Sequence, residues 1–239
     1  MTRRLYSWAF AAALAGAVHS VGATDDPYLG WSSKQAEAIG MQAYKRGRVG
    51  GILDGRILKT ERSYNYKLAA TWLTSDVCRA TARLLQLTSR LSPAETQALV
   101  AEAEAIPGTV IMIEIDPREG SGVIPTTWEA FLQPKSRPAG ARRGTISPQL
   151  RDVKALAGVL RRNYDYDRFW VVFPLMQDDG TPVFNAGDAT AELIVRIYDK
   201  EGHVEWTIPN EIKTVRRTAS QIDDGLRVRR LSQLRAPIQ

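Results

Sequence analysis

The sequence of 239 residues contains one cysteine and two histidines. Because Cys78 is the single cysteine, no disulfide can form within the chain, and a structural zinc site, which takes four Cys or His ligands, is excluded. His19 lies in the apolar N-terminal stretch, which we expect to be removed. A Ser-His-Asp or Cys-His enzyme would therefore have to use His203. The sequence therefore predicts no bound metal and no cofactor.

The sequence also lacks a strongly apolar run of about 20 residues, the length that spans a bilayer. The N-terminus instead has Arg3 and Arg4, then an apolar stretch rich in Ala and Gly, then Val-Gly-Ala ending at Ala23. This order is typical of a cleavable secretory signal peptide, and an uncleaved membrane anchor is the alternative. We expect residues 1–23 to be removed and the remaining chain to be periplasmic or secreted, and not transmembrane.

Positive and negative charge alternate in blocks along the chain. Loss of Arg3 and Arg4 lowers the formal net charge from +6 to +4, and the charge is +7 over 135–162, −6 over 163–209 and +4 over 210–239. The simplest partner for a basic block is an acidic block of the same chain. The alternative is that the exposed cations bind an anionic surface.

The candidate cations of the basic blocks lie in two arginine-rich stretches, "PKSRPAGARRG" and "GLRVRRLSQLR". We single out Arg142, Arg143, Arg229 and Arg230 as candidate binding residues. In an exported protein the anionic surface would be phospholipid headgroups or acidic glycans, and we expect no nucleic acid partner.

Apolar periodicity predicts the elements of the fold. Helices are expected over 32–47, over 75–91 and 92–106 as a helical hairpin with a capping box at Ser92 and Glu95, and over 150–164. Strands are expected over 64–72, which alternates as a half-buried strand, and over 109–115, 128–134, 168–176, 193–198 and 203–208. The stretch over 137–148 is predicted to be a loop, and Cys78 to be a small buried side chain of its helix.

The last two strands predict a hairpin with a defined register. A four-residue loop over 199–202 pairs Tyr198 with His203, Ile197 with Val204 and Arg196 with Glu205. One face of this hairpin is apolar, and the other carries a cross-strand ion pair and an exposed His203 at the mouth of the turn.

These elements predict an α+β fold, a mostly antiparallel immunoglobulin-like β-sandwich with an inserted helical hairpin and one further helix. The domain boundaries follow: a signal peptide over 1–23, an N-terminal helix and Gly-rich linker over 24–60, the sandwich over 61–209, and a basic segment over 210–239 that is helical or partly disordered. The stretch "YNYKLAATWLTSDVCRATARLLQL", the helices after it and "FWVVFPL" resemble uncharacterised exported bacterial proteins across 63–208. No activity is implied by that resemblance.

The Gly-rich stretch "DPREGSGVIP" is the remaining candidate site. It lacks the Lys and the following helix of a phosphate-binding loop, so we interpret it as a connection between strands. Its Asp116, Arg118 and Glu119 are candidate binding residues because functional side chains are frequent on loops.

The function expected from these observations is that of a non-enzymatic binding or scaffold domain of the cell envelope, with an envelope protein or an anionic lipid or glycan surface as its partner. The alternative is a hydrolase of envelope glycans that uses two carboxylates. Its candidate acids are Glu114, Asp116, Glu119, Asp165 and Asp167.

Overall fold

Two four-stranded antiparallel sheets and a group of helices form the fold of the computed structural model, which describes residues 26–48, 66–117, 127–159, 167–198 and 200–213. Sheet A has the strand order β1-β2-β6-β5 and sheet B has the order β4-β3-β7-β8. The strands of sheet A are β1 (Tyr66–Trp72), β2 (Thr109–Pro117), β6 (Asp167–Phe173) and β5 (Thr145–Ile146). Those of sheet B are β4 (Arg142–Arg143), β3 (Trp128–Pro134), β7 (Thr190–Ile197) and β8 (Lys200–Thr207).

The main hydrophobic core lies between the two sheets. Alternate residues of the longer strands enter it, among them Ile111, Ile113 and Ile115 of β2 and Leu193 and Val195 of β7. An aromatic cluster closes one side of this core, with the Trp72 and Trp206 rings 5.5 Å apart and Phe184 beside them. The expectation of an α+β fold with mostly antiparallel strands is confirmed.

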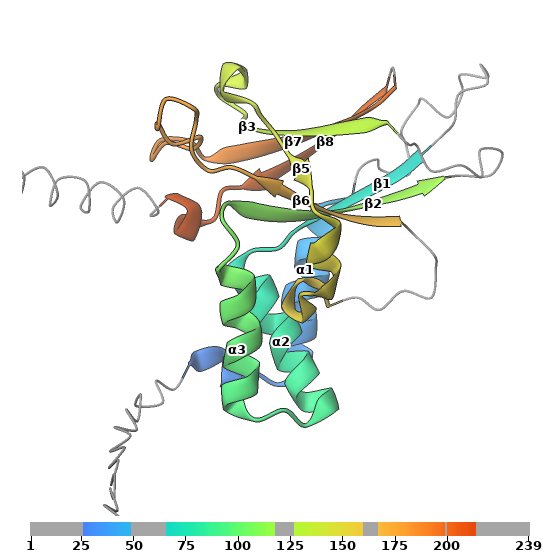
Figure 1. Ribbon diagram of the computed structural model, residues 1–239, viewed down its shortest axis with the longest axis vertical. Coiled ribbons are helices and arrows are strands. Elements are labelled where there is room, and N and C mark those ends of the chain that lie inside the picture. The colour runs from blue at the N-terminus through green and yellow to red at the C-terminus, as the bar shows by residue number, and fades with distance from the viewer. Residues whose placement is uncertain (1–25, 49–65, 118–126, 160–166, 199, 214–239) are drawn as a thin grey trace, which may run out of the picture.

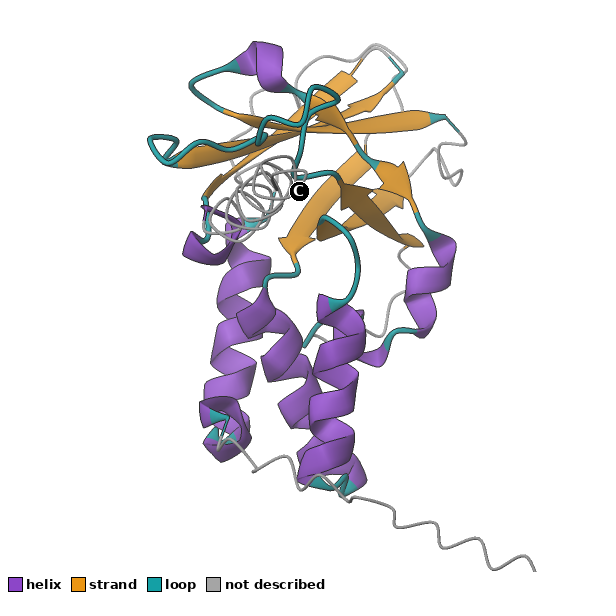
Figure 2. Ribbon diagram, turned by 60° about the vertical axis from the view of Figure 1, so that its left-hand side comes forward, coloured by secondary structure: helices purple, strands orange, loops and turns teal. Residues whose placement is uncertain are grey.

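The opposite face of sheet A is covered by helices (Figures 1 and 2). The long helices are α1 (Ser33–Arg46), α2 (Ser75–Ser89) and α3 (Pro93–Glu104). Val110 and Met112 of β2 pack against this helical layer while their neighbours in sequence face sheet B. Because β2 is buried on both faces, its sequence reads as a continuous apolar run, as predicted.

The helical hairpin forms as its sequence predicts. Ser92 accepts a hydrogen bond from the Glu95 N–H, and the Glu95 carboxylate accepts one from the Ser92 N–H, which is the predicted capping box. The first helix of the hairpin, α2, begins at Ser75, as predicted, with Thr74 as its N-cap residue. Its Ser75 N–H donates to the Glu211 carboxylate at 3.0 Å, so a residue from the far end of the chain caps this helix.

Strand β1 differs from its prediction because it is buried on both faces. Leu68, Ala70 and Trp72 enter the core between the sheets, while Ala69 and Thr71 lie beneath the helices at 7% and 4% exposure. The alternation suggested a half-buried strand because Ala and Thr are common on exposed strand faces as well.

The predicted helix over 150–164 is wrong for its described part. Residues 148–156 form two 3₁₀ turns, η4 (Pro148–Asp152) and η5 (Lys154–Leu156), separated by an extended Val153. The remaining residues up to 159 are not helical, and 160–164 lie outside the described part of the chain. The tighter turns bury Leu150, Ala155 and Leu156 against the helical layer, so tertiary packing overrides the helical period of the sequence.

The β7–β8 hairpin has the predicted faces but a different register. Ile197 pairs with Lys200, which leaves a two-residue turn that begins at Tyr198 with a φ of 54°. Lys200 and Glu201 therefore join the ladder, which extends to eight pairs. The shift from the predicted register is an even number of residues, so the apolar face is unchanged.

The side-chain partners on the polar face of this hairpin change with the register. Arg196 lies opposite Glu201, with Nη2 2.6 Å from Oε1, and the predicted Arg196–Glu205 pair is wrong. His203 lies opposite Ile194 and away from the turn, and its Nδ1 is 2.9 Å from Glu192 Oε1.

Candidate functional site

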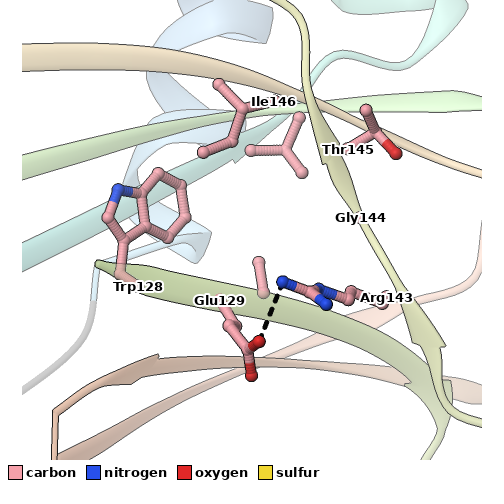
Figure 3. A pocket seen from close by; sticks show the side chains of 8 residues that line it. Trp128, Glu129, Arg143, Gly144, Thr145 and Ile146 are labelled. Carbon is pink, nitrogen blue, oxygen red and sulfur yellow. Dashed lines mark ion pairs between the residues drawn. The ribbon is translucent and has the colours of Figure 1, made fainter. Parts of the chain in front are cut away.

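A groove opens at one edge of the sandwich, between β3 of sheet B and β5 and β6 of sheet A (Figure 3). Its volume is about 510 Å³, in the range of ligand-binding clefts. The residues that line it are Trp128, Glu129, Ala130, Arg143, Gly144, Thr145, Ile146 and Val171.

The groove exists because the chain changes sheets within one residue. Arg142 and Arg143 pair with β3 in sheet B, and Thr145 and Ile146 pair with β6 in sheet A, so Gly144 is the crossing point. The Gly144 N–H donates to the Ala130 carbonyl at 2.8 Å, which holds the crossing against β3. Since β4 pairs with β3 at 131 and 132 alone, the sheets stay open beyond the crossing.

The floor of the groove is apolar and rigid. Trp128 is 8% exposed and packs edge-on against Phe169 at 5.0 Å between ring centroids, and Val171 is fully buried. Ile146, by contrast, is 41% exposed, although it is a large aliphatic side chain. Covering an exposed apolar side chain that faces an indole ring with another apolar group lowers the free energy, because apolar surface is removed from water.

The rim of the groove is charged but internally balanced. Arg143 Nη2 lies 2.9 Å from Glu129 Oε1, from neighbouring strands of sheet B (Figure 3). Glu129 is the one acidic side chain among the lining residues, and none of them is Ser, Cys or His. The groove can therefore hold a ligand, and its described lining residues do not present the two carboxylates that glycoside hydrolysis uses.

The four cations between residues 135 and 143 are ion-paired with carboxylates of the same chain. Three of these carboxylates belong to the acidic block over 163–209, and the fourth is Glu129. The pairs are Lys135–Glu205 at 2.6 Å, Arg137–Asp188 at 2.7 Å, Arg142–Asp178 at 3.0 Å and Arg143–Glu129 at 2.9 Å. The stretch over 137–148 was expected to be a loop, but it contains η3 (Pro138–Gly140) and the short strands β4 and β5.

The structure brings together only part of the predicted site. Arg142 and Arg143 lie side by side in β4, on opposite faces of sheet B. The backbone of Asp116 lies in β2 opposite Lys67, and its side chain is outside the described part of the chain. Arg118, Glu119, Arg229 and Arg230 also lie outside it, as does the Gly-rich stretch.

The candidate carboxylates of a hydrolase do not meet in the groove. Glu114 is 3% exposed in sheet A, and burial raises its pKa, an effect that the Arg168 guanidinium at 3.1 Å only partly offsets. Asp167 begins β6 opposite Ile115. Glu119 and Asp165 lie outside the described part of the chain.

Trp128, Ile146 and Val171 were not identified from the sequence as functional residues. Trp128 and Val171 were predicted in strands, where an apolar side chain is expected to enter the core, and Ile146 was predicted in a loop, so their spacing carries no signal of a site. Only the geometry of the crossing at Gly144 leaves them beside an opening.

Two further features bear on candidate ligands. The described residues contain no group of three or more His, Cys, Asp or Glu side chains placed to hold a metal ion. Within the same residues, no helix combines the length and the apolar character that a membrane span requires.

Cys78 is buried at 4% exposure, as predicted, and burial raises the pKa of its thiol to about 12. Since the thiolate is the reactive form, we expect no alkylation of the folded protein at pH 8 and complete alkylation in concentrated urea. Mass spectrometry after treatment with iodoacetamide measures this directly. Rapid stoichiometric labelling without urea would contradict the buried placement of α2.

Comparison with known proteins shows little similarity. No protein-family model matches the sequence, and no curated protein matches it. The chain is similar to a crystal structure of a novel protein of unknown function from Burkholderia pseudomallei K96243, with 12% identity and a TM-score of 0.36. The similarity covers 76% of this chain and 88% of that protein.

Proposed function

We propose that this chain is an exported binding or scaffold domain of the cell envelope, periplasmic or secreted, which holds an apolar segment of an envelope protein in the groove beside Trp128 and Ile146. The observation that carries this proposal is the exposed Ile146 facing Trp128 across a cleft of about 510 Å³. The signal-like residues 1–23 support export.

The fold that we propose is immunoglobulin-like. Naming β1 to β8 as strands A, B, C, C′, D, E, F and G gives the sheets A-B-E-D and C′-C-F-G, the order of immunoglobulin-type sandwiches. Trp128 is a buried Trp on the strand equivalent to C, a further feature of that fold. The helical hairpin would then be an insertion between strands A and B.

A protein partner is favoured over an anionic lipid or glycan surface. The four cations between residues 135 and 143, Lys135, Arg137, Arg142 and Arg143, each have a carboxylate of this chain within 3.0 Å. A phosphate or acidic sugar would have to displace these carboxylates, whereas an apolar side chain needs no such exchange.

The test is capture of envelope protein by the chain from Thr24 onward, at low salt and at about 0.3 M salt, where exposed charges are largely screened. Ile146→Glu places a carboxylate in the groove and should abolish capture at both salt concentrations. The matched control is Leu87→Glu, because Leu87 is 43% exposed on α2 and Ile146 is 41% exposed. The control should retain capture.

Three results would count against the proposal. Equal capture by both variants would place binding away from the groove. Capture that disappears at about 0.3 M salt would favour an anionic or purely electrostatic partner. An absence of any captured protein would remove the binding role.

A further inference from the structure

Strand β8 is the long edge strand of sheet B in the described part of the chain. It pairs with β7 over eight residues, and no described strand lies on its other side. The remaining edges offer less backbone. β4 and β5 have two residues each, and along β1 the Ala70 N–H donates to the Gly47 carbonyl at 2.8 Å.

The direction of the free backbone groups on β8 follows from one hydrogen bond. The Ile208 N–H donates to the Ala189 carbonyl at 3.0 Å, so the even-numbered residues of β8 face β7. Because hydrogen-bonding directions alternate along an antiparallel strand, the odd-numbered residues face outward. These residues are Glu201, His203, Glu205 and Thr207.

Strand β8 also lacks two of the devices that commonly block an edge, a bulge and a proline. The register with β7 is continuous, so there is no bulge, and there is no proline between Lys200 and Thr207. An edge of this kind is a template for another strand.

We propose that β8 is a homodimer edge, on which β8 of a second copy pairs antiparallel about a twofold axis at Val204. The proposal is independent of the groove. Pairing of outward backbone groups requires odd residues opposite odd residues. Full overlap of the four outward residues then places Glu201 opposite Thr207 and His203 opposite Glu205 of the second copy.

Charge favours this register over its neighbours. It sets an imidazole opposite a carboxylate twice and opposes no like charges, which is stabilising between cross-strand pairs. A shift by two residues in one direction opposes Glu201 to Glu205 of the other copy, and a shift in the other direction opposes Glu205 to itself. Both alternatives place like charges face to face.

The buried face of β8 fits the same axis. Val204, which is 4% exposed, would lie opposite its own counterpart. Gly202 would lie opposite Trp206 of the second copy, where the absence of a side chain leaves space beside the indole. The two sheets would form one continuous sheet across the axis.

Engineered cysteines test the register directly. Opposed residues of a hydrogen-bonded pair have Cα atoms about 5.5 Å apart, which suits a disulfide. Glu201→Cys/Thr207→Cys in the chain from Thr24 should give a covalent dimer on oxidation. Each single variant should give no covalent dimer, because its cysteine would lie about 20 Å from its counterpart, six residues along the strand.

A proline variant tests the edge without disturbing the fold. The Glu205 N–H faces outward, so Glu205→Pro removes a donor that only an incoming strand uses. We expect loss of the dimer in sedimentation velocity at high protein concentration, with an unchanged far-ultraviolet circular dichroism spectrum. The control Glu205→Ala keeps the N–H and should keep the dimer.

The proposal would be overturned by a monomeric native chain at high concentration, by dimers that persist in Glu205→Pro, or by no cross-linking of the double variant. A cross-link in a single-cysteine variant would overturn the register.

Discussion

Replacing Asp188 with alanine will lower the free energy of unfolding by about 3 kcal/mol at pH 7, because it removes a buried carboxylate that accepts three hydrogen bonds. Asp188 is 5% exposed in the connection between β6 and β7. Its carboxylate accepts hydrogen bonds from Arg137 Nη2, Ser136 Oγ and the Asn185 N–H, each at 2.7 Å. The variant leaves these three donors without their acceptor.

The effect of Asp188 should depend on pH. Burial alone would raise the pKa of Asp188, but the hydrogen bonds from Arg137, Asn185 and Ser136 outweigh burial and lower the pKa to about 2. An unfolded Asp has a pKa of about 3.9, so the carboxylate stabilises the fold fully above that pH. The stabilisation is then lost as the pH falls through about 2.

Urea unfolding of the native chain and of Asp188→Ala at pH 7 and at pH 2.5 measures both effects. The difference between the two proteins should be largest at pH 7 and should shrink at pH 2.5. Asp178→Ala is the control, because the Asp178 carboxylate is 99% exposed beside Arg142 and its loss should not be measurable. A similar loss in both variants, or a difference that grows in acid, would refute the role of this cluster.

Replacing Gly144 with alanine will lower the free energy of unfolding by about 2 kcal/mol through overpacking at the crossing between the sheets. A Cβ at this position would lie 2.3 Å from Val171 Cγ1 and 2.6 Å from Phe173 Cε1. Both neighbours are fully buried, and the branched Val171 side chain has little freedom to rotate away. The crossing must therefore shift outward.

The matched control for Gly144→Ala is Gly187→Ala. A Cβ at Gly187 would meet nothing within 4 Å, so this variant should be neutral or gain about 0.5 kcal/mol from reduced freedom of the unfolded chain. Denaturant midpoints of the two variants give the comparison. If Gly144→Ala were as stable as Gly187→Ala, the crossing would not be packed as described, and the shape of the groove would have to be reconsidered.

Local signals were reliable where they depend on neighbouring residues in the chain. The capping box of Ser92 and Glu95 was predicted because both partners lie within one turn of helix. The apolar run of β2 and the apolar face of the β7–β8 hairpin were predicted because the period of two fixes which side chains share a face.

Signals that depend on partners far along the chain were misread. Alternation in β1 could not reveal that helices cover the second face, and the helical period over 150–159 gave way to two turns that pack better on the helical layer. The error in the hairpin register had a different, local cause, the length of one turn. The two-residue turn with Tyr198 at positive φ added Lys200 and Glu201 to the ladder.

The sequence by itself determined the α+β class, the antiparallel strands, the helical hairpin and the burial of Cys78, because propensity, capping and apolar period are properties of short segments. Only the tertiary structure decided that the cations from Lys135 to Arg143 are paired with carboxylates. It alone placed Trp128, Ile146 and Val171 around a groove and made β8 an edge of the described sheet. The ion pairs join residues that are 14 to 70 positions apart in the chain, and the groove joins separate strands, so no local pattern carries them.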